Sequence, residues 1–230
     1  MRAMKQLKSS NNDDVWIILA AYNEQDRIKS VLDAVKKHAK HIIVVDDGSK
    51  DGTADIVRKC KGVTLLQHKR NLGKGSAVRS GCDFAVKQGA NILVLMDSDG
   101  QHDARNIPRF IKTMKDVDVV FGYRTERSQM PLLYKFGNWF LTMYTFLLFG
   151  SRIKDTQGGF RSMTSDAYKK IRWHATRYEM ETEMIAHAAK HKLKYRQIPI
   201  KTIYHDAYKG TSVSDGFKIC WHMLKWRLGL

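Results

Sequence analysis

The apolar run Ile92-Leu93-Val94-Leu95-Met96 passes directly into the polar segment Asp97-Ser98-Asp99-Gly100-Gln101-His102. Five consecutive apolar residues are typical of a strand that is buried on both faces of a sheet. The acidic residues and the glycine that follow are typical of a loop. We therefore predict a buried strand at residues 92–96 that carries two carboxylates at its carboxyl end.

The order of strand, polar loop and helix recurs on both sides of this segment. The other expected strands are 15–21, 41–45, 63–66 and 117–121, and the expected helices are 24–38, 75–87, 106–115 and one that begins near 53. Within 24–38, apolar residues at 28, 31, 32 and 35 have the spacing of one helix face. This alternation predicts an α/β fold with a mixed, mostly parallel sheet flanked by helices.

Polar residues follow four of the expected strands, at 22–24, 46–49, 97–99 and 122–124. Ligands of open α/β sheets bind outside the carboxyl ends of the strands. We therefore expect these four strand ends to converge on one cleft.

The segment after the strand at 92–96 has the composition of a divalent-metal site. Asp97, Asp99 and Gln101 offer hard oxygen ligands, which suit Mg²⁺ or Mn²⁺. Such an ion would stabilise the charge of a leaving diphosphate. The alternative is a helix-capping turn, in which aspartate and serine are also common.

Three other segments are candidates for binding a nucleotide. Asp46 or Asp47 could hold a base or a ribose hydroxyl, and Tyr22 and Glu24 could stack on and bond to the nucleoside. Lys74 lies between two glycines before a helix, where backbone amides can approach a diphosphate. The alternatives are ordinary turn residues for the aspartates and a surface hairpin for the lysine.

Two segments have the pattern of helices that lie in a membrane interface. Residues 128–150 place large apolar side chains on one helical stripe and polar ones on another, and the C-terminal segment 213–230 adds basic residues. We expect both to bind an anionic membrane surface without spanning it, because a crossing would separate Asp155 from Asp97. The alternative is that both stripes pack into the core or a dimer interface.

The composition limits the class of protein and its partners. The net charge of +17 suits nucleic acid, an anionic membrane or phosphorylated substrates. Three cysteines without metal-site spacing fit a reducing, cytosolic environment, and no signal peptide is expected. We expect a polar tail at 1–14 and one domain at 15–212, followed by the C-terminal helix.

Six segments, in this order, resemble the family 2 glycosyltransferases of the GT-A fold, and within them the dolichyl- or polyprenyl-phosphate hexose synthases. They are Ala20-Ala21-Tyr22-Asn23-Glu24, Val45-Asp46-Asp47-Gly48-Ser49, Asn71-Leu72-Gly73-Lys74-Gly75, Asp97-Ser98-Asp99-Gly100-Gln101-His102, Gly122-Tyr123-Arg124 and Asp155-Thr156-Gln157-Gly158-Gly159-Phe160-Arg161. The first departs from the family's frequent pattern in having Ala20 where proline is common.

The resemblance implies a role for each matching residue. The nucleotide-sugar would be bound by Ala20, Tyr22, Glu24, Asp46, Asp47, Lys74, Asp97 and Ser98, and the metal by Asp97, Asp99 and Gln101. Arg124, Lys135 and Lys209 would hold the acceptor phosphate, and Asp155, Gln157 and Arg161 would line the reaction centre.

The activity implied is inverting transfer of a hexose or N-acetylhexosamine from a UDP- or GDP-sugar to dolichyl or polyprenyl phosphate. It would occur at the cytoplasmic face of a membrane, with the enzyme bound peripherally. One alternative is a transferase that acts on a hydroxyl of a glycan or small molecule. Another is a basic nucleic-acid-binding module, which would leave the acidic strand ends unexplained; we expect no nucleic-acid partner.

Overall fold

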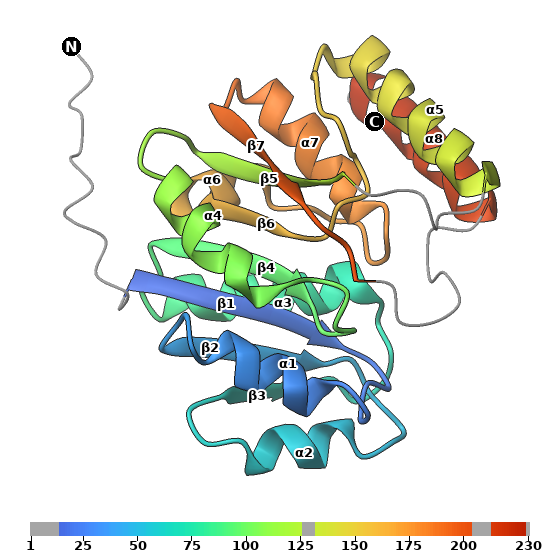
Figure 1. The fold of residues 1–230 in the computed structure, drawn as a ribbon. Coiled ribbons are helices and arrows are strands. Elements are labelled where there is room, and N and C mark those ends of the chain that lie inside the picture. Colours follow the sequence, from blue (N-terminus) through green and yellow to red (C-terminus); the bar gives the residue numbers. More distant parts are fainter. Residues whose placement is uncertain (1–13, 126–131, 204–212, 229–230) are drawn as a thin grey trace.

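The computed structural model describes residues 14–125, 132–203 and 213–228 of the 230-residue chain (Figure 1). Its centre is a seven-stranded sheet with the order β3-β2-β1-β4-β6-β5-β7. The strands are β1 (Val15–Ala21), β2 (His41–Asp46), β3 (Thr64–Gln67), β4 (Ile92–Asp97), β5 (Val119–Arg124), β6 (Arg161–Thr164) and β7 (Tyr195–Ile200). The five strands expected from the sequence are therefore confirmed, with small differences in their bounds.

The sheet is mixed because a single strand runs against the others. β1, β2, β3 and β4 pair in parallel, and β5 pairs in parallel with β7. β6 lies between β4 and β5 and is antiparallel to both. The predicted mixed, mostly parallel sheet is confirmed.

Helices cover both faces of the sheet (Figure 1). The helices are α1 (Ile28–Val35), α2 (Thr53–Lys59), α3 (Lys74–Lys87), α4 (Ile107–Thr113), α5 (Leu132–Phe149), α6 (Ser165–Ile171), α7 (Met180–Lys190) and α8 (Val213–Leu228), with a short 3-10 turn η2 (Ala104–Asn106) before α4. One apolar core lies between the sheet and α1, α2 and α4. A second lies on the opposite face, beneath α3, α6 and α7.

The first helix is shorter than the 24–38 expected from its apolar spacing. The backbone nitrogens of Arg27 and Ile28 both donate to the carbonyl oxygen of Glu24, at 3.0 and 2.9 Å. These turns occupy the segment before α1, so the regular helix begins only at Ile28. The apolar face itself is buried as predicted, at 28, 31, 32 and 35.

Helices α5 and α8 pack together at the edge of the molecule, and many of their large apolar side chains are exposed. They pack on each other through Leu141, Ile219 and Met223. The polar Asn138 and Thr145 of α5 are buried, at 6% and 0% exposure. Large apolar side chains face outward instead, namely Leu132, Phe136, Trp139, Phe140, Met143, Phe146 and Leu147 on α5 and Phe217, Trp221 and Leu228 on α8.

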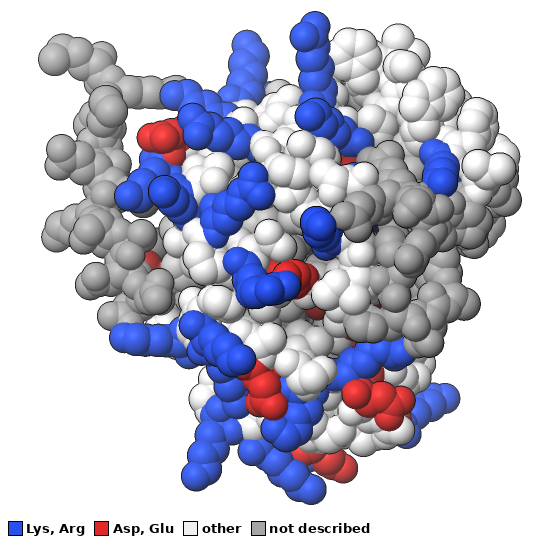
Figure 2. Space-filling model, viewed as in Figure 1, with Lys and Arg blue, Asp and Glu red and all other residues white. Residues whose placement is uncertain are grey.

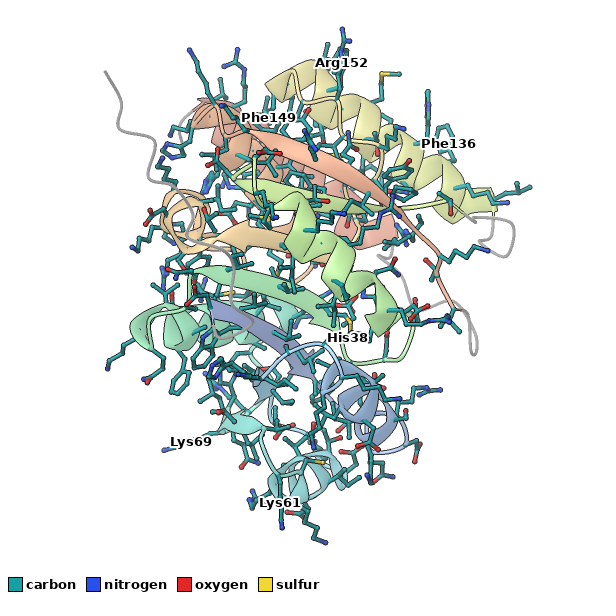
Figure 3. The ribbon with its side chains drawn as sticks, turned by 60° about the vertical axis from the view of Figure 1, so that its left-hand side comes forward. His38, Lys61, Lys69, Phe136, Phe149 and Arg152 are labelled. Atoms are coloured by element: carbon teal, nitrogen blue, oxygen red, sulfur yellow. The ribbon has the colours of Figure 1, made fainter. Side chains whose placement is uncertain are left out.

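In Figure 2 the upper right, where Figure 1 places α5 and α8, is mostly white, the colour of residues other than Lys, Arg, Asp and Glu, whereas Lys and Arg side chains are spread over the rest of the face in view. In Figure 3, Phe136 and Phe149 mark the two ends of α5. Within the three described ranges, no helix combines the length and hydropathy that crossing a bilayer requires.

Candidate active site

A cavity of about 390 Å³ opens at the carboxyl ends of the central strands. Its wall combines the ends of β1, β4 and β5 with the first residues of α3 and α7. The predicted site residues that line it are Ala20, Tyr22, Glu24, Asp47, Lys74, Asp97, Ser98, Asp99, Gln101, Arg124 and Gln157. The strand ends thus converge on one cleft, as the alternating pattern indicated.

Other predicted site residues lie outside this wall. Asp46, Lys135, Asp155 and Arg161 do not line the cavity, and Lys209 lies outside the described residues. Asp46 is fully buried and accepts hydrogen bonds from the backbone nitrogen of Ser49 and from Nε2 of Gln67, both at 3.2 Å. Its carboxylate therefore holds the loop after β2 and does not face the cavity. Lys135 is part of α5.

Asp47 shapes the cavity by holding the loop before α3. Its carboxylate accepts hydrogen bonds from the backbone nitrogens of Leu72 and Gly73, at 2.9 and 2.8 Å, and lies 2.7 Å from Nδ1 of His68. Gly73 has a φ of +95°. A β-carbon on Gly73 would lie 2.4 Å from the carbonyl oxygen of Thr176. The chain can pass here only because the residue is glycine.

The segment before α7 closes the cavity and was not anticipated from the sequence. Glu183 accepts hydrogen bonds from the backbone nitrogens of His174 and Ala175, both at 2.8 Å. Nε1 of Trp173 donates to the carbonyl oxygen of Gly75 at 2.9 Å. The bonds to Glu183 tie the segment to α7 and the bond from Trp173 ties it to the start of α3, and Arg177, Tyr178 and Glu181 line the wall.

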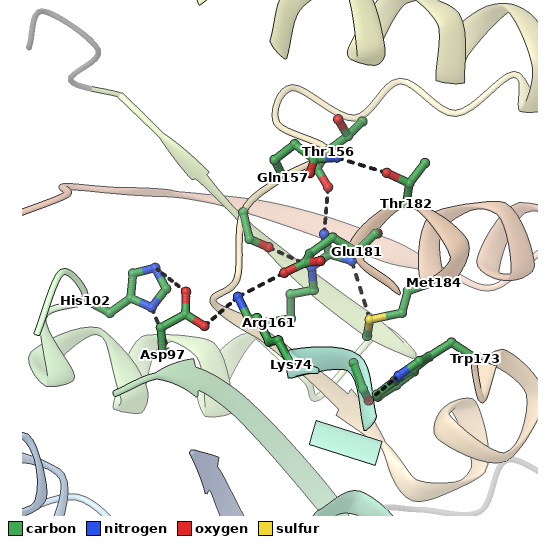
Figure 4. A network of polar contacts seen from close by, with 12 residues as sticks. Lys74, Asp97, His102, Thr156, Gln157, Arg161, Trp173, Glu181, Thr182 and Met184 are labelled. Atoms are coloured by element: carbon green, nitrogen blue, oxygen red, sulfur yellow. Dashed lines mark hydrogen bonds and ion pairs between the residues drawn. The ribbon is translucent and has the colours of Figure 1, made fainter. Parts of the chain in front are cut away.

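Three charged groups meet at the centre of the cavity (Figure 4). Nζ of Lys74 lies 2.7 Å from Oδ1 of Asp97 and 2.9 Å from Oε1 of Glu181. Burial lowers the pKa of Lys74, but both carboxylates outweigh it, so the pKa is raised and the ammonium stays charged. Burial likewise works against the charge on Asp97, yet Lys74 holds the pKa of that carboxyl below its usual range.

The acidic strand end fits part of a divalent-metal site. Asp97 and Asp99 supply carboxylate oxygens, and the backbone nitrogen of Gln101 donates to Oδ1 of Asp99 at 2.9 Å. Burial and the neighbouring Asp97 raise the pKa of Asp99, a cost that a bound cation would relieve. Among the described residues no three His, Cys, Asp or Glu side chains are grouped for a metal.

Arg124 and Asp155, predicted for separate roles, form one bidentate pair. Nε and Nη2 of Arg124 donate to Oδ2 and Oδ1 of Asp155, at 2.7 and 3.0 Å. The Asp155 side chain is fully buried, while 14% of the Arg124 side chain is exposed. The backbone nitrogen of Gln157 also donates to Asp155, at 3.2 Å. The arginine therefore faces the cavity, and the aspartate fixes its orientation from behind.

Arg161 lies beneath the cavity and binds backbone carbonyls. Its guanidinium donates to the oxygens of Gly158, Glu181 and Thr156, at 2.8, 2.6 and 2.9 Å. Burial lowers the pKa of Arg161 to about 10. The side chain therefore connects the loop before β6 to the first turn of α7.

Comparison with known proteins identifies the class. Residues 16–172 match the model of Glycosyl transferase family 2. The chain is 35% identical to the UDP-N-acetylglucosamine–dolichyl-phosphate N-acetylglucosaminyltransferase of Methanococcus voltae, over 94% of this chain and 96% of that one. It is 26% identical to the undecaprenyl-phosphate mannosyltransferase of Micrococcus luteus, over 94% of this chain and 99% of that one.

Among solved structures, the fold resembles that of glucosyl-3-phosphoglycerate synthase from Mycobacterium tuberculosis in complex with Mn²⁺, UDP-glucose and phosphoglyceric acid. The TM-score is 0.74 at 16% identity, over 95% of this chain and 80% of that one. The fold and the matched family define a GT-A glycosyltransferase. The chain belongs to glycosyl transferase family 2, and the predicted resemblance to its polyprenyl-phosphate sugar transferases is confirmed.

Proposed function

We propose that the protein transfers a hexose or N-acetylhexosamine from a UDP- or GDP-sugar to dolichyl or another polyprenyl phosphate. One observation carries the proposal: a single cavity joins the carboxylates of Asp97 and Asp99 to the guanidinium of Arg124. The carboxylates suit a metal-bound diphosphate, and an arginine is suited to a second phosphate. Relatives that act on dolichyl and undecaprenyl phosphate support this reading.

The donor would lie along β1, β2 and β4. Tyr22, Glu24 and Asp47 line the part of the cavity suited to the nucleoside, with Ala20 beside them. Oγ of Ser98 donates to the carbonyl oxygen of Ala20 at 2.7 Å, which joins the ends of β1 and β4 beneath the donor.

Asp97 and Asp99 would hold Mg²⁺ or Mn²⁺, with Gln101 beside them; the ion supplies charge stabilisation to the leaving diphosphate. Crystal structures of a protein with the same fold contain Mn²⁺ or Mg²⁺ together with UDP.

The acceptor would be a phosphate monoester held by Arg124. Such a phosphate has a second pKa of about 6, so at pH 7 it is mostly dianionic and needs little help from a general base. This agrees with the burial of Asp155 behind Arg124, where the carboxylate positions the arginine. In an inverting displacement, a phosphate oxygen bonds to the anomeric carbon as the bond to the nucleotide diphosphate breaks.

The donor and the acceptor can be tested separately. A thermal-shift panel of UDP- and GDP-sugars with Mn²⁺, and with EDTA as control, should show stabilisation by one nucleotide class, because a ligand that binds only the native state raises Tm. The matching labelled sugar should then appear on polyprenyl phosphate. Transfer to a soluble hydroxyl acceptor, with none to polyprenyl phosphate, would favour the alternative glycan or small-molecule transferase.

Arg124→Gln is expected to raise KM for polyprenyl phosphate by about 10- to 100-fold, because a charge-assisted bond to phosphate contributes about 1.5 to 3 kcal/mol. KM for the nucleotide-sugar should change little. Arg105→Gln, which alters an exposed arginine outside the cavity, is the matched control. Unchanged lipid kinetics in Arg124→Gln would remove this residue from the acceptor site.

We further propose that the enzyme binds the cytoplasmic face of a membrane peripherally, through α5 and α8. The exposed side chains of these helices supply an apolar surface, and Lys225 and Arg227 in the last turn of α8 would attract anionic headgroups. The prediction that the apolar stripe of α5 lies outside the core agrees with its exposure. Whether residues 15–212 act as one unit and 213–230 as a separate anchor stays a prediction.

Phe136→Ser/Trp139→Ser is expected to lower the fraction bound to liposomes by at least about tenfold, because each exposed aromatic side chain contributes about 1.5 to 3 kcal/mol when buried. Flotation with anionic lipid and increasing salt measures the binding. Leu72→Ser removes a side chain of similar exposure that lies outside α5 and α8, and should float like the wild type. Equal flotation of all three proteins would contradict the assignment of this surface.

A further inference from the structure

Lys74 occupies the place where a metal ion would be expected. Its ammonium lies 2.7 Å from Oδ1 of Asp97, the carboxylate that begins the metal motif (Figure 4). A second carboxylate, Glu181, holds the same ammonium at 2.9 Å from the other side. The positive charge that balances the site is thus supplied by the chain itself.

The other oxygen of Asp97 offers a metal little room. A β-carbon on Gly159 would lie 2.4 Å from Oδ2 of Asp97, so the backbone already fills this side. Nε2 of His102 lies 4.0 Å from the same oxygen, and its ring is buried. A divalent ion that reaches Asp97 therefore approaches Oδ1, where it meets the ammonium of Lys74 and is repelled by it.

The structure also shows how Lys74 could leave Asp97 without becoming unpaired. Glu181 is only 2% exposed, and its second oxygen, Oε2, has no hydrogen-bond donor within the described part of the chain. The ammonium can therefore turn away from Asp97 and stay bonded to Glu181. The backbone of Lys74 itself is held in place, because the segment 173–177 clamps both neighbouring glycines.

We propose that Lys74 is the resident cation of the metal site, and that Glu181 positions it for exchange with a divalent ion when a nucleotide diphosphate binds. This inference rests on the proposed function. In the free enzyme Lys74 neutralises Asp97 and opposes the metal. When the diphosphate arrives, the ammonium passes from Asp97 to a phosphate oxygen and pivots on Glu181, and Asp97 would then be free to hold the metal.

The exchange makes binding of the metal and binding of the nucleotide cooperative. Metal alone must displace an ammonium whose one remaining carboxylate partner is Glu181, whereas the diphosphate supplies a second anion that the ammonium can bind. Because coupling between two ligands is reciprocal, the metal raises nucleotide affinity by the same factor. Without the charge of Lys74, the metal alone should bind more tightly. The further gain in metal affinity that the nucleotide gives should therefore be smaller.

The test measures Mn²⁺ affinity by titration with detection of free Mn²⁺ by electron paramagnetic resonance, with and without saturating UDP and, separately, GDP. In the wild type the nucleotide should raise Mn²⁺ affinity by at least about tenfold. In Lys74→Met, Mn²⁺ alone should bind about tenfold more tightly than to the wild type, and the gain from nucleotide should shrink correspondingly.

Two variants separate exchange from a general change in charge. Lys74→Met/Glu181→Gln removes one positive and one negative charge, so the net charge of the site stays that of the wild type; Mn²⁺ alone should still bind more tightly. Arg177→Met removes a positive charge from the same cavity and should leave Mn²⁺ affinity within about threefold of the wild type. The double variant also keeps the test usable if Lys74→Met alone fails to fold.

The outcomes distinguish this inference from the proposed function. If the wild type binds Mn²⁺ with nucleotide but Lys74→Met and the double variant show unchanged or weaker binding of Mn²⁺ alone, the exchange is refuted and the proposed function stands. If Arg177→Met strengthens Mn²⁺ binding as much as Lys74→Met, the effect is one of net charge and the exchange is again refuted. If no protein binds Mn²⁺ with either nucleotide, the metal site of the proposed function fails together with the exchange.

Discussion

Asp97→Asn is expected to lower kcat/KM by about 10³-fold, with little loss of folded protein. Removing one electrostatic group that acts on developing charge typically costs 10²- to 10³-fold. Here the substitution would also remove a proposed metal ligand and the partner of Lys74. The measurement is transfer of labelled sugar to polyprenyl phosphate across a range of Mn²⁺ concentrations, with Tm recorded for each protein.

Ser98→Ala is the matched control for this prediction. It alters the neighbouring residue in the same strand end and removes a neutral hydrogen bond to Ala20. We expect a loss of about tenfold or less, because a neutral hydrogen bond contributes only about 0.5 to 1.5 kcal/mol. If Asp97→Asn kept near wild-type kcat/KM at every Mn²⁺ concentration, Asp97 would not be part of the donor site.

Arg161→Met is expected to destabilise the folded protein by about 3 to 5 kcal/mol, a fall in Tm of roughly 10 °C. The substitution leaves the buried carbonyl oxygens of Thr156, Gly158 and Glu181 without the donor that serves them all. The measurement is thermal and urea unfolding at neutral pH. A large loss of activity without a loss of stability would instead indicate that Arg161 acts directly at the reaction centre, as the family resemblance implied.

Arg172→Met is the control for this stability prediction. Unlike Arg161, which donates to backbone carbonyls, Arg172 forms a bidentate pair, through Nε and Nη2, with the carboxylate of Asp83. Its side chain is 43% exposed, so the pair lies in a solvated setting. Exposed pairs contribute about 1 kcal/mol or less, and the fall in Tm should be correspondingly small. The two variants therefore show what the same substitution costs at a buried and at an exposed arginine.

Strands that contain a local apolar run could be predicted from the sequence, and β6 and β7 could not. β1, β2 and β4 are buried on both faces, so their sequences are almost entirely apolar and their bounds differ from prediction by at most one residue. β6 has only four residues, Arg-Ser-Met-Thr, and its burial is imposed by β4 and β5 on either side. β7 contains a proline and three polar or charged residues, which is compatible with its place at the edge of the sheet.

The site could be predicted where a short motif carries both the residue and its position. Asp97, Asp99 and Lys74 belong to such motifs, and the structure brings all three to one cavity. Glu181 carries no such signal, because two acidic residues in the first turn of a helix are common at the surface. Its contact with Lys74 joins segments far apart in the chain and depends on tertiary packing alone.

The motifs also did not predict that Arg124 pairs with Asp155. Each residue was assigned to the site through its own segment, and nothing local indicated that one would bury the other. The bidentate geometry changes the role expected of Asp155, because a carboxylate that accepts from Arg124 and from the backbone of Gln157 has its oxygens directed away from the cavity. The distinction requires coordinates, since sequence gives residue types and not the direction of side chains.

The buried polar side chains of α5 limit which insertions and deletions this helix can accept. Nδ2 of Asn138 lies 3.5 Å from Oδ1 of Asp155, so the helix touches the group that orients Arg124. One residue inserted between Phe140 and Leu141 would rotate everything before it in α5 by about 100° relative to the rest. Asn138 would then turn outward and an aromatic side chain would turn toward Asp155. Insertions and deletions in this helix are therefore tolerable only in steps that restore its phase.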